Sequence, residues 1–351
     1  MLKKSVYKFK AVGLLFSMVF LAGCQNFKTN EHLDMAYESI NELEYDTALL
    51  HIQDALDNGE DERLVLRAKG ITCLGMGDYT EAINSFEKSL SLSNGIIEKM
   101  DIDINYYLAT AYYKSGNLDE AIKIYDTILS IYKNEVDARF LRGILYAQKN
   151  ELELAKNDFD KAISLAPNDY EMLIKIYQIL FENGYKDVGL NYLQDALGSG
   201  SKKMSNYEKG QISFYLEDYE SAKTYLEKAV EEVGESAALF LGRTYELLGD
   251  TNYAVSVYSS YIGTGDASAE IYNQLGLCKM NMMDYEGALT AFQQAMQREN
   301  CNITQSLKFN EIVAYEHLGN FDKAKSLMDV YIRNYPDDEA AKKEAQFLKT
   351  R

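Results

Sequence analysis

The sequence predicts an all-α fold, a solenoid built from stacked pairs of helices. The first observation behind this prediction is an alanine that recurs at steps close to 34 residues. The series runs Ala48, Ala82, Ala121, Ala155, Gly189 in place of an alanine, Ala222, Ala254, Ala288 and Ala324. A period of this length is typical of helix–turn–helix repeats, which bury a continuous core only by stacking on their neighbours. Nine repeats are therefore in register, and such arrays are usually binding scaffolds rather than enzymes.

The second observation is a small residue that precedes the recurring alanine by twelve positions in seven of the nine repeats. The small residues are Ala36, Gly70, Ala109, Gly143, Gly210, Gly242 and Gly276. They indicate where two helices cross, because only small side chains let helix axes approach closely. The other two repeats have Tyr177 and Ile312 at this place, which predicts wider helix spacing there.

A large apolar side chain follows the alanine by four positions in every repeat, one helical turn further on. These side chains are Ile52, Phe86, Tyr125, Phe159, Leu193, Leu226, Tyr258, Phe292 and Met328. The third observation is a glycine five positions before the alanine, at Gly77, Gly116, Gly184, Gly249 and Gly319. Glycine suits the end of a helix because it tolerates a positive φ, so each of these residues predicts a turn between two helices.

Together these positions resemble the tetratricopeptide repeat family. Segments such as Gly77-Asp78-Tyr79-Thr80-Glu81-Ala82 look much like that family's turn between helices. The resemblance covers residues 29–338 and implies a right-handed superhelical solenoid of about nine units. Residues 339–351 form a modest apolar stripe among charged side chains, which predicts a C-terminal capping helix.

The N-terminus has the pattern of a secretory signal. Four lysines within residues 1–10 precede an apolar run over residues 11–22, which is too short to span a bilayer comfortably. The run ends in Leu21-Ala22-Gly23-Cys24, which is similar to a bacterial lipoprotein signal. That resemblance implies removal of residues 1–23 and attachment of lipid, palmitate included, to Cys24. The two acyl chains of the attached lipid would anchor the protein stably in the membrane.

Residues 24–28 would then form a short tether on the extracytoplasmic face of a bacterial membrane. By the same resemblance, Gln25 would permit transport to the outer membrane in a cell with two membranes. The chain has 54 acidic and 36 basic residues and a net charge of −18, which becomes −22 without the four signal lysines. Such an acidic surface argues against nucleic acid as a partner, because phosphates require positive charge.

Residues for catalysis are scarce. The chain has three histidines, His32, His51 and His317, which fall in the first and last repeats. We therefore expect no catalytic triad and no three-ligand metal site from them. No phosphate-binding loop or nucleophile elbow is present in the sequence. The sequence thus predicts no catalytic, cofactor-binding or metal-ligating residue.

The resemblance implies a binding groove lined by the first helix of each repeat, at positions about fifteen and eight residues before the alanine. Aromatic side chains are frequent at both positions, at Tyr106, Tyr113, Phe140, Phe181, Tyr207, Phe214, Phe240 and Phe309. Exposed apolar surface usually marks an interaction site, although each side chain could instead pack on the neighbouring repeat.

The sequence therefore predicts a lipid-anchored, non-catalytic scaffold that binds a protein or peptide segment in an aromatic groove. The alternative from another class is a binding protein for a small ligand or cell-wall glycan that stacks on the tyrosines. Self-association through the same groove is also left open, since a two-fold contact needs only one apolar patch.

Overall fold

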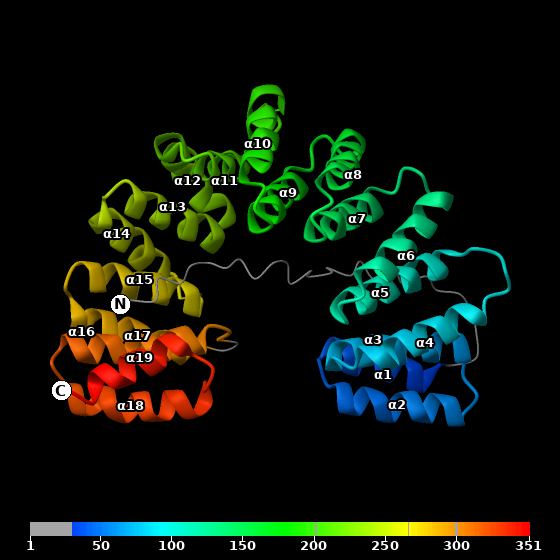
Figure 1. Ribbon diagram of the computed structural model, residues 1–351, viewed down its shortest axis with the longest axis horizontal. Helices are drawn as coiled ribbons and strands as arrows, with labels where there is room; N and C mark the ends of the chain where they lie inside the picture. Colours follow the sequence, from blue (N-terminus) through cyan, green and yellow to red (C-terminus); the bar gives the residue numbers. More distant parts are fainter. Residues whose placement is uncertain (1–29, 201, 266, 299–300) are drawn as a thin grey trace. The chain divides into compact units, whose positions relative to one another are not determined.

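A computed structural model describes residues 30–351, except residues 201, 266, 299 and 300. The expected signal sequence, Cys24 and the rest of the expected tether lie outside the described residues. The described part contains nineteen α-helices and no strand, which confirms the prediction of an all-helical repeat fold (Figure 1). No helix in this part is both long and apolar enough to cross a membrane.

Eighteen of the helices form nine consecutive pairs, and we call the first helix of each pair the A-helix and the second the B-helix. The A-helices are α1 (Glu31–Asn41), α3 (Glu62–Met76), α5 (Lys99–Lys114), α7 (Val136–Gln148), α9 (Tyr170–Glu182), α11 (Asn206–Tyr215), α13 (Glu235–Leu247), α15 (Ala269–Asn281) and α17 (Thr304–His317). The B-helices are α2 (Tyr45–Asp57), α4 (Tyr79–Ser91), α6 (Leu118–Ile131), α8 (Leu152–Leu165), α10 (Lys186–Gly200), α12 (Tyr219–Val233), α14 (Thr251–Ile262), α16 (Tyr285–Met296) and α18 (Phe321–Asn334). The last helix is α19 (Glu339–Leu348).

The chain divides into two compact bodies, each described here by itself. The N-terminal body contains residues 30–172 and 179–184, and the C-terminal body contains residues 173–178 and 185–351. In the first body, successive A-helices touch directly, α1 with α3 and α3 with α5. In the second body α11 touches α13, and α13 touches α15 (Figure 1). Each body therefore has a row of A-helices. We call the side of this row that faces away from the B-helices the A-face.

Opposite side-chain sizes explain how two helices of one repeat approach each other. A Cβ built on Gly143 would lie 2.6 Å from the ring of Phe159, and one on Gly210 would lie 2.6 Å from the Leu226 side chain. Both distances are shorter than real Cβ contacts, so an alanine would force the buried partner to move. The glycine twelve positions before the recurring alanine therefore makes room for the large side chain four positions after it.

The fifth repeat reverses this arrangement. Its large Tyr177 stands where seven of the repeats have a small residue, and Gly189 stands where the other repeats have alanine. A Cβ on Gly189 would lie only 3.0 Å from the Tyr177 ring. The expectation of wider helix spacing at Tyr177 overlooked this compensation, in which the missing methyl group of Gly189 gives space to the ring.

The turn inside each repeat uses a left-handed residue in all nine cases. The five predicted glycines have φ values between 73° and 86°. The same place in the other repeats is occupied by Leu43, Asn150, Glu217 and Met283, with φ values between 60° and 64°. The turn geometry is thus common to the array; Asn150 tolerates it, whereas Leu43, Glu217 and Met283 carry side chains that disfavour it.

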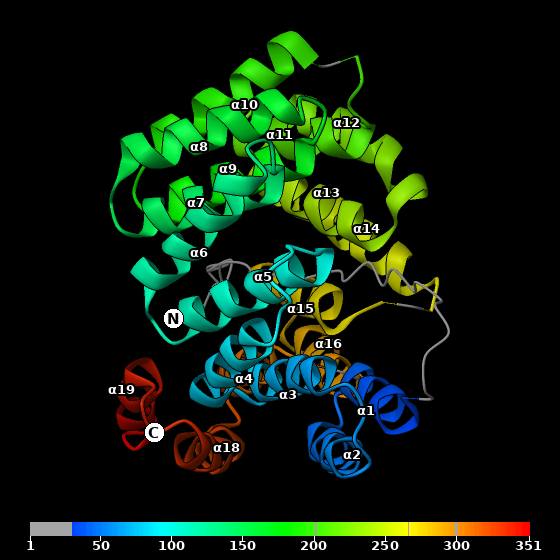
Figure 2. The same ribbon diagram turned by 90° about the vertical axis from the view of Figure 1, so that its right-hand side faces the viewer.

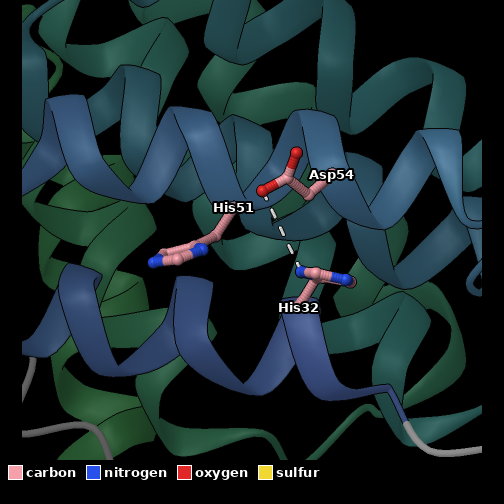
Figure 3. Close-up of side chains that lie close together, drawn as sticks. All are labelled: His32, His51 and Asp54. Atoms are coloured by element: carbon pink, nitrogen blue, oxygen red, sulfur yellow. Dashed lines mark ion pairs between the residues drawn. The ribbon is translucent and has the colours of Figure 1, made fainter.

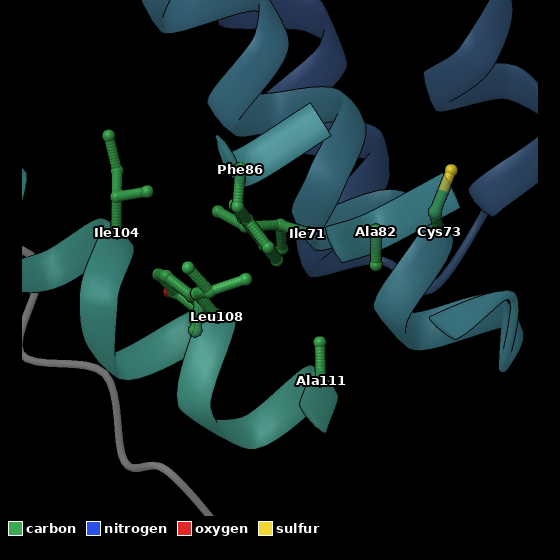
Figure 4. Packing of buried hydrophobic residues seen from close by; sticks show 8 residues of the cluster. Ile71, Cys73, Ala82, Phe86, Ile104, Leu108 and Ala111 are labelled. Carbon is green, nitrogen blue, oxygen red and sulfur yellow. The ribbon is translucent and has the colours of Figure 1, made fainter. Parts of the chain in front are cut away.

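Neighbouring repeats share their cores. In the second and third repeats, Phe86 of α4 stacks on Tyr107 of α5, with the ring centroids 5.7 Å apart. Ile71, Ala82 and Leu108 belong to the same cluster (Figure 4). Cys73 is also buried there, and this burial raises the pKa of its thiol, as expected for a cysteine that acts as a small apolar side chain.

The C-terminal end of the array is covered by α19, which packs on α18 (Figure 2). Leu348 of α19 is buried, and Asp338 accepts a hydrogen bond of 2.7 Å from the Tyr331 hydroxyl of α18. The Asp338 carboxylate also accepts bonds from the Ala340 and Ala341 amides and so caps α19. Helix α19 therefore lies within the segment expected to form a capping helix.

Candidate binding surface

A cluster of aromatic side chains in the C-terminal body lies where α11 meets α13. Phe240 is at its centre, with its ring centroid 5.3 Å from Phe214, 5.9 Å from Tyr215 and 6.1 Å from Tyr207. Each of these pairs meets edge to face, the arrangement that the aromatic quadrupole favours. We call this group the Phe240 cluster; it consists of Tyr177, Tyr207, Phe214, Tyr215, Tyr219 and Phe240.

The exposure of these rings differs within the cluster. Phe214 is only 9% exposed, whereas Tyr207 and Phe240 are half-buried. The Arg243 guanidinium lies over the Phe214 ring at 5.5 Å. The surface thus offers partly accessible aromatic side chains beside one cation, and such residues dominate the binding energy of protein interfaces.

Three of the predicted aromatics of the N-terminal body, Tyr106, Tyr113 and Phe140, are half-buried and are held by side chains of their own or the next repeat. The Tyr106 hydroxyl donates a hydrogen bond of 3.4 Å to Glu135, and burial raises the pKa of this phenol. The Tyr113 hydroxyl accepts a bond of 3.1 Å from the amide of Gln148. Phe140 packs against Phe159 with a centroid separation of 6.3 Å. These three residues hold the repeats together and still present part of their surface.

Phe181 is the most exposed of the eight predicted groove residues. It lies at the C-terminal end of α9, and half of its surface is accessible. Phe309 is the opposite case, because it is 1% exposed and its ring meets Tyr331 edge to face at 5.7 Å. The prediction that Phe309 lines the groove is therefore wrong. Its side chain fills the core between the two helices of the last repeat.

A second apolar surface was not predicted. The step from Ala82 to Ala121 is 39 residues, longer than the others, and the extra residues form the connection from α4 to α5. Exposed apolar side chains gather at this connection and at the end of α6, namely Leu92, Ile96, Ile97, Ile131 and Tyr132. They border a pocket of about 250 Å³ lined by Leu90, Ile97, Ile102 and Ile128, among others. The irregular step was the signal that could have identified this surface.

The histidines lie in the first and last repeats, where the sequence places them. His317 stacks on Tyr285 in the C-terminal body, with the ring centroids 4.7 Å apart. His32 and His51, by contrast, both belong to the first repeat and lie close to Asp54. The sequence analysis compared the three histidines only with one another and did not consider the Asp54 carboxylate, three residues after His51. The helix places these two residues on the same face.

Comparison with known families agrees with this architecture. Family models described as tetratricopeptide repeat match residues 74–145, 136–169, 205–232, 269–300 and 309–338. Together these ranges cover just over half of the chain. The chain belongs to the tetratricopeptide repeat family. Proteins of this repeat class generally act as non-catalytic scaffolds for protein interaction, and their stacked repeats present extended binding surfaces.

Several characterised proteins are similar to this tetratricopeptide repeat chain over part of their length. BBSome complex member bbs-4 of Caenorhabditis elegans is 28% identical over 195 residues, which cover 52% of this chain and 42% of that protein. Tetratricopeptide repeat protein 13 of Homo sapiens is 28% identical over 207 residues, which cover 56% of this chain and 24% of that protein. The matched region therefore spans less than half of either relative.

Among solved structures, a tetratricopeptide repeat protein from Parabacteroides merdae is 18% identical with a TM-score of 0.47. That match covers 71% of this chain and 98% of the other. Human IFIT1 is 16% identical with a TM-score of 0.43, covering 93% of this chain and 87% of the other.

Proposed function

We propose that this tetratricopeptide repeat protein is a lipid-anchored, extracytoplasmic scaffold that binds a segment of another protein on its A-face. The observation that carries the proposal is the Phe240 cluster, where rings from three A-helices and one B-helix meet at a partly accessible surface. Tyrosine and phenylalanine provide large contact areas at a low cost in conformational entropy, because few of their torsions must be fixed.

The edge-to-face packing of the cluster favours a peptide over a flat ligand. A stacked sugar or base needs the open face of a ring, and the Phe240 ring is surrounded by Tyr207, Phe214 and Tyr215. An apolar side chain of a bound segment needs only the space between ring edges. Because the chain is acidic, it would also attract basic residues that flank such a segment.

The location rests on the sequence of residues 1–24. The lysines, the apolar run and the Leu-Ala-Gly-Cys ending support cleavage before Cys24 and attachment of lipid to this residue. The proposal predicts that the chain becomes labelled with a fatty acid and partitions with the membrane fraction. A Cys24→Ala variant should lose the label, and incorporation of label into that variant would contradict the assignment of Cys24.

Photo-crosslinking tests the A-face. A photoreactive residue placed at Phe181 or Tyr207 should capture a membrane-associated protein from native membranes. The matched control is Tyr253, an aromatic residue of the B-helix α14 whose side chain is also exposed. Capture at the two A-face positions and not at Tyr253 supports the proposal, and the crosslinked peptide would give the chemistry of the bound segment.

Substitution provides the second arm of this test. With the photoreactive residue at Phe240, Tyr207→Ala should weaken capture because the two rings are neighbours in the Phe240 cluster, whereas Tyr253→Ala should have no effect. Capture only at Tyr253 would assign binding to the B-helices. If neither face captured protein but the purified chain bound glycan fragments, the small-ligand function would replace the scaffold function.

A further inference from the structure

Two histidines and one aspartate of the first repeat face the same space between α1 and α2. His32 belongs to α1, and His51 and Asp54 belong to α2 (Figure 3). One nitrogen of each imidazole and one oxygen of the carboxylate all lie within 4.8 Å of one another. The His32 Nδ1 atom is 4.0 Å from the Asp54 Oδ2 atom, too far for a hydrogen bond. The three groups converge without direct hydrogen bonds between His32 and Asp54.

The histidine nitrogens at this site have unused bonding capacity. The Nδ1 atoms of His32 and His51 are both buried, and neither has a hydrogen-bond partner among the described residues. Buried polar atoms in folded proteins almost always have a partner, so two orphaned nitrogens beside one carboxylate require an explanation. A bound cation supplies one, because a neutral imidazole nitrogen is a strong ligand for a divalent transition metal.

The surrounding structure holds the ligands in place and leaves the site open. The Glu60 carboxylate accepts hydrogen bonds of 3.0 Å from the backbone amides of His32 and Leu33, which fixes the start of α1. His51 and Asp54 are three residues apart on α2 and therefore share a helix face. The Asp54 side chain is 56% exposed, so an ion can enter beside it.

We propose that His32, His51 and Asp54 bind one Zn²⁺ ion. Two imidazoles and one carboxylate are a ligand set that zinc accepts, with a water molecule at the fourth position. Tetrahedral coordination at Zn–N distances of about 2.0–2.1 Å places ligand atoms about 3.4 Å apart. The site must therefore contract slightly, and rotation of the exposed Asp54 side chain can provide this movement.

The bound ion joins α1 to α2 and thereby stabilises the first repeat. Helix α1 has no preceding helix in the described part of the chain, and it buries only Leu33, Ala36 and Ser39. A ligand that binds the folded repeat and not the unfolded one shifts the equilibrium toward the folded form. This role is independent of any protein bound on the A-face, so it stands or falls by itself.

Zinc binding is measured by competition with a chromophoric chelator, using the chain in detergent without a polyhistidine tag. The wild-type chain should bind one Zn²⁺ tightly, and His51→Ala and Asp54→Asn should each weaken binding by at least about 100-fold. Co²⁺ in place of Zn²⁺ should give the visible absorption of a four-coordinate ion in the wild type and lose it in both variants. The matched control is His317→Ala, which removes the histidine outside the site and should leave binding unchanged.

Hydrogen exchange locates the ion. Added Zn²⁺ should slow amide exchange in residues 31–57 and have no such effect in residues 304–334, and His51→Ala should abolish the slowing. The proposal is overturned if the wild type binds no Zn²⁺, if His51→Ala binds it equally well, or if all variants share weak binding without a fixed stoichiometry. Circular dichroism before the titrations shows whether the variants retain their helices, and Asp54→Asn preserves side-chain shape if His51→Ala does not fold.

Discussion

The first repeat buries three side chains of α1 and three of α2, whereas the last repeat buries six of α17 and three of α18. The difference follows from what covers each end. The last repeat has α16 before it and α19 after it, so α17 and α18 are enclosed. The first repeat packs against α3 on one side only among the described residues. The two ends of this array therefore differ in how completely their cores are closed.

This comparison bears on where the chain opens first. In a linear array, each repeat is stabilised mainly by its own contacts and those with its neighbours, so an end can unfold while the rest stays folded. Apolar burial closes the C-terminal end, and at the N-terminal end the proposed zinc ion would supply part of the missing stabilisation. Four predictions for the two ends test this difference, from the largest expected effect to the smallest.

Phe309→Ala should have the largest effect, a destabilisation of about 3–5 kcal/mol. Phe309 is almost completely buried and contacts Tyr331, so its removal leaves a cavity in the better closed of the two terminal repeats. Hydrogen exchange should become faster throughout α17, α18 and α19. Exchange in α1–α4 should stay unchanged, and equal acceleration at both ends would contradict the view that the ends open independently.

Ile52→Ala should destabilise the first repeat by a smaller amount, about 2–3 kcal/mol, near the lower limit for such substitutions. Ile52 is buried against Leu33 and Val65, but the repeat is open on one side, so neighbouring side chains can partly collapse into the space. Exchange should accelerate in α1 and α2 and much less in α5. A loss of stability as large as that of Phe309→Ala would show that the first repeat is closed as well as the last.

The carboxyl pair of Glu316 and Glu344 should make the C-terminal end sensitive to pH. Burial, with the neighbouring Glu344 carboxyl as the next cause, raises the pKa of Glu316 to about 7 from its ordinary 4.5. The folded state then holds a proton more tightly than the unfolded state. The stability that this group contributes is therefore greatest below about pH 4.5, falls as the pH rises through 7, and is lost above it.

Exchange of the α19 amides, corrected for the intrinsic effect of pH, should show this loss of protection between pH 5.5 and 8. Glu316→Gln, which stays neutral, should remove the dependence and protect α19 at pH 8. The control is Glu339→Gln, a substitution at an exposed residue of α19. If that control also removed the dependence, general charge rather than the buried pair would be responsible.

The sequence predicted the repeat architecture because each of its signals is local. The glycine at the turn, the small residue at the helix crossing and the large residue that fills it all act within one repeat, so spacing alone reveals them. Tyr177 with Gly189 shows the limit of this reasoning. Each departs from its own pattern, and only their proximity shows that the two departures compensate each other.

The candidate surfaces were harder to predict, because exposure depends on neighbouring repeats. Phe309 and Tyr207 occupy equivalent positions in their repeats, yet Phe309 is enclosed and Tyr207 is half-buried. The zinc ligands come from two helices and two residue types, and no periodic pattern links His32 to Asp54. Packing between helices therefore decides which side chains are accessible, and the spacing of residues within one repeat does not reveal this packing.

The smallest expected effect compares the turns of the two terminal repeats. Leu43 and Gly319 occupy the same left-handed place, with φ values of 62° and 73°. A side chain with a Cβ is strained in this conformation by roughly 1–2 kcal/mol, and Leu43 is 69% exposed, so its side chain contributes little burial in return. Leu43→Gly should therefore stabilise the first repeat by about 0.5–1 kcal/mol, after subtracting the extra flexibility of glycine in the unfolded chain.

The reverse substitution, Gly319→Leu, should destabilise the last repeat by a similar amount, because a Cβ at Gly319 meets open space and only the backbone strain changes. Both effects are measured as changes in the opening free energy of the amides of the affected repeat. Opposite signs at the two ends would show that the turn residue acts through φ alone. If Leu43→Gly instead destabilised the first repeat, the exposed leucine would have to make a contact that the described residues do not contain, and this end would be more closed than its burial indicates.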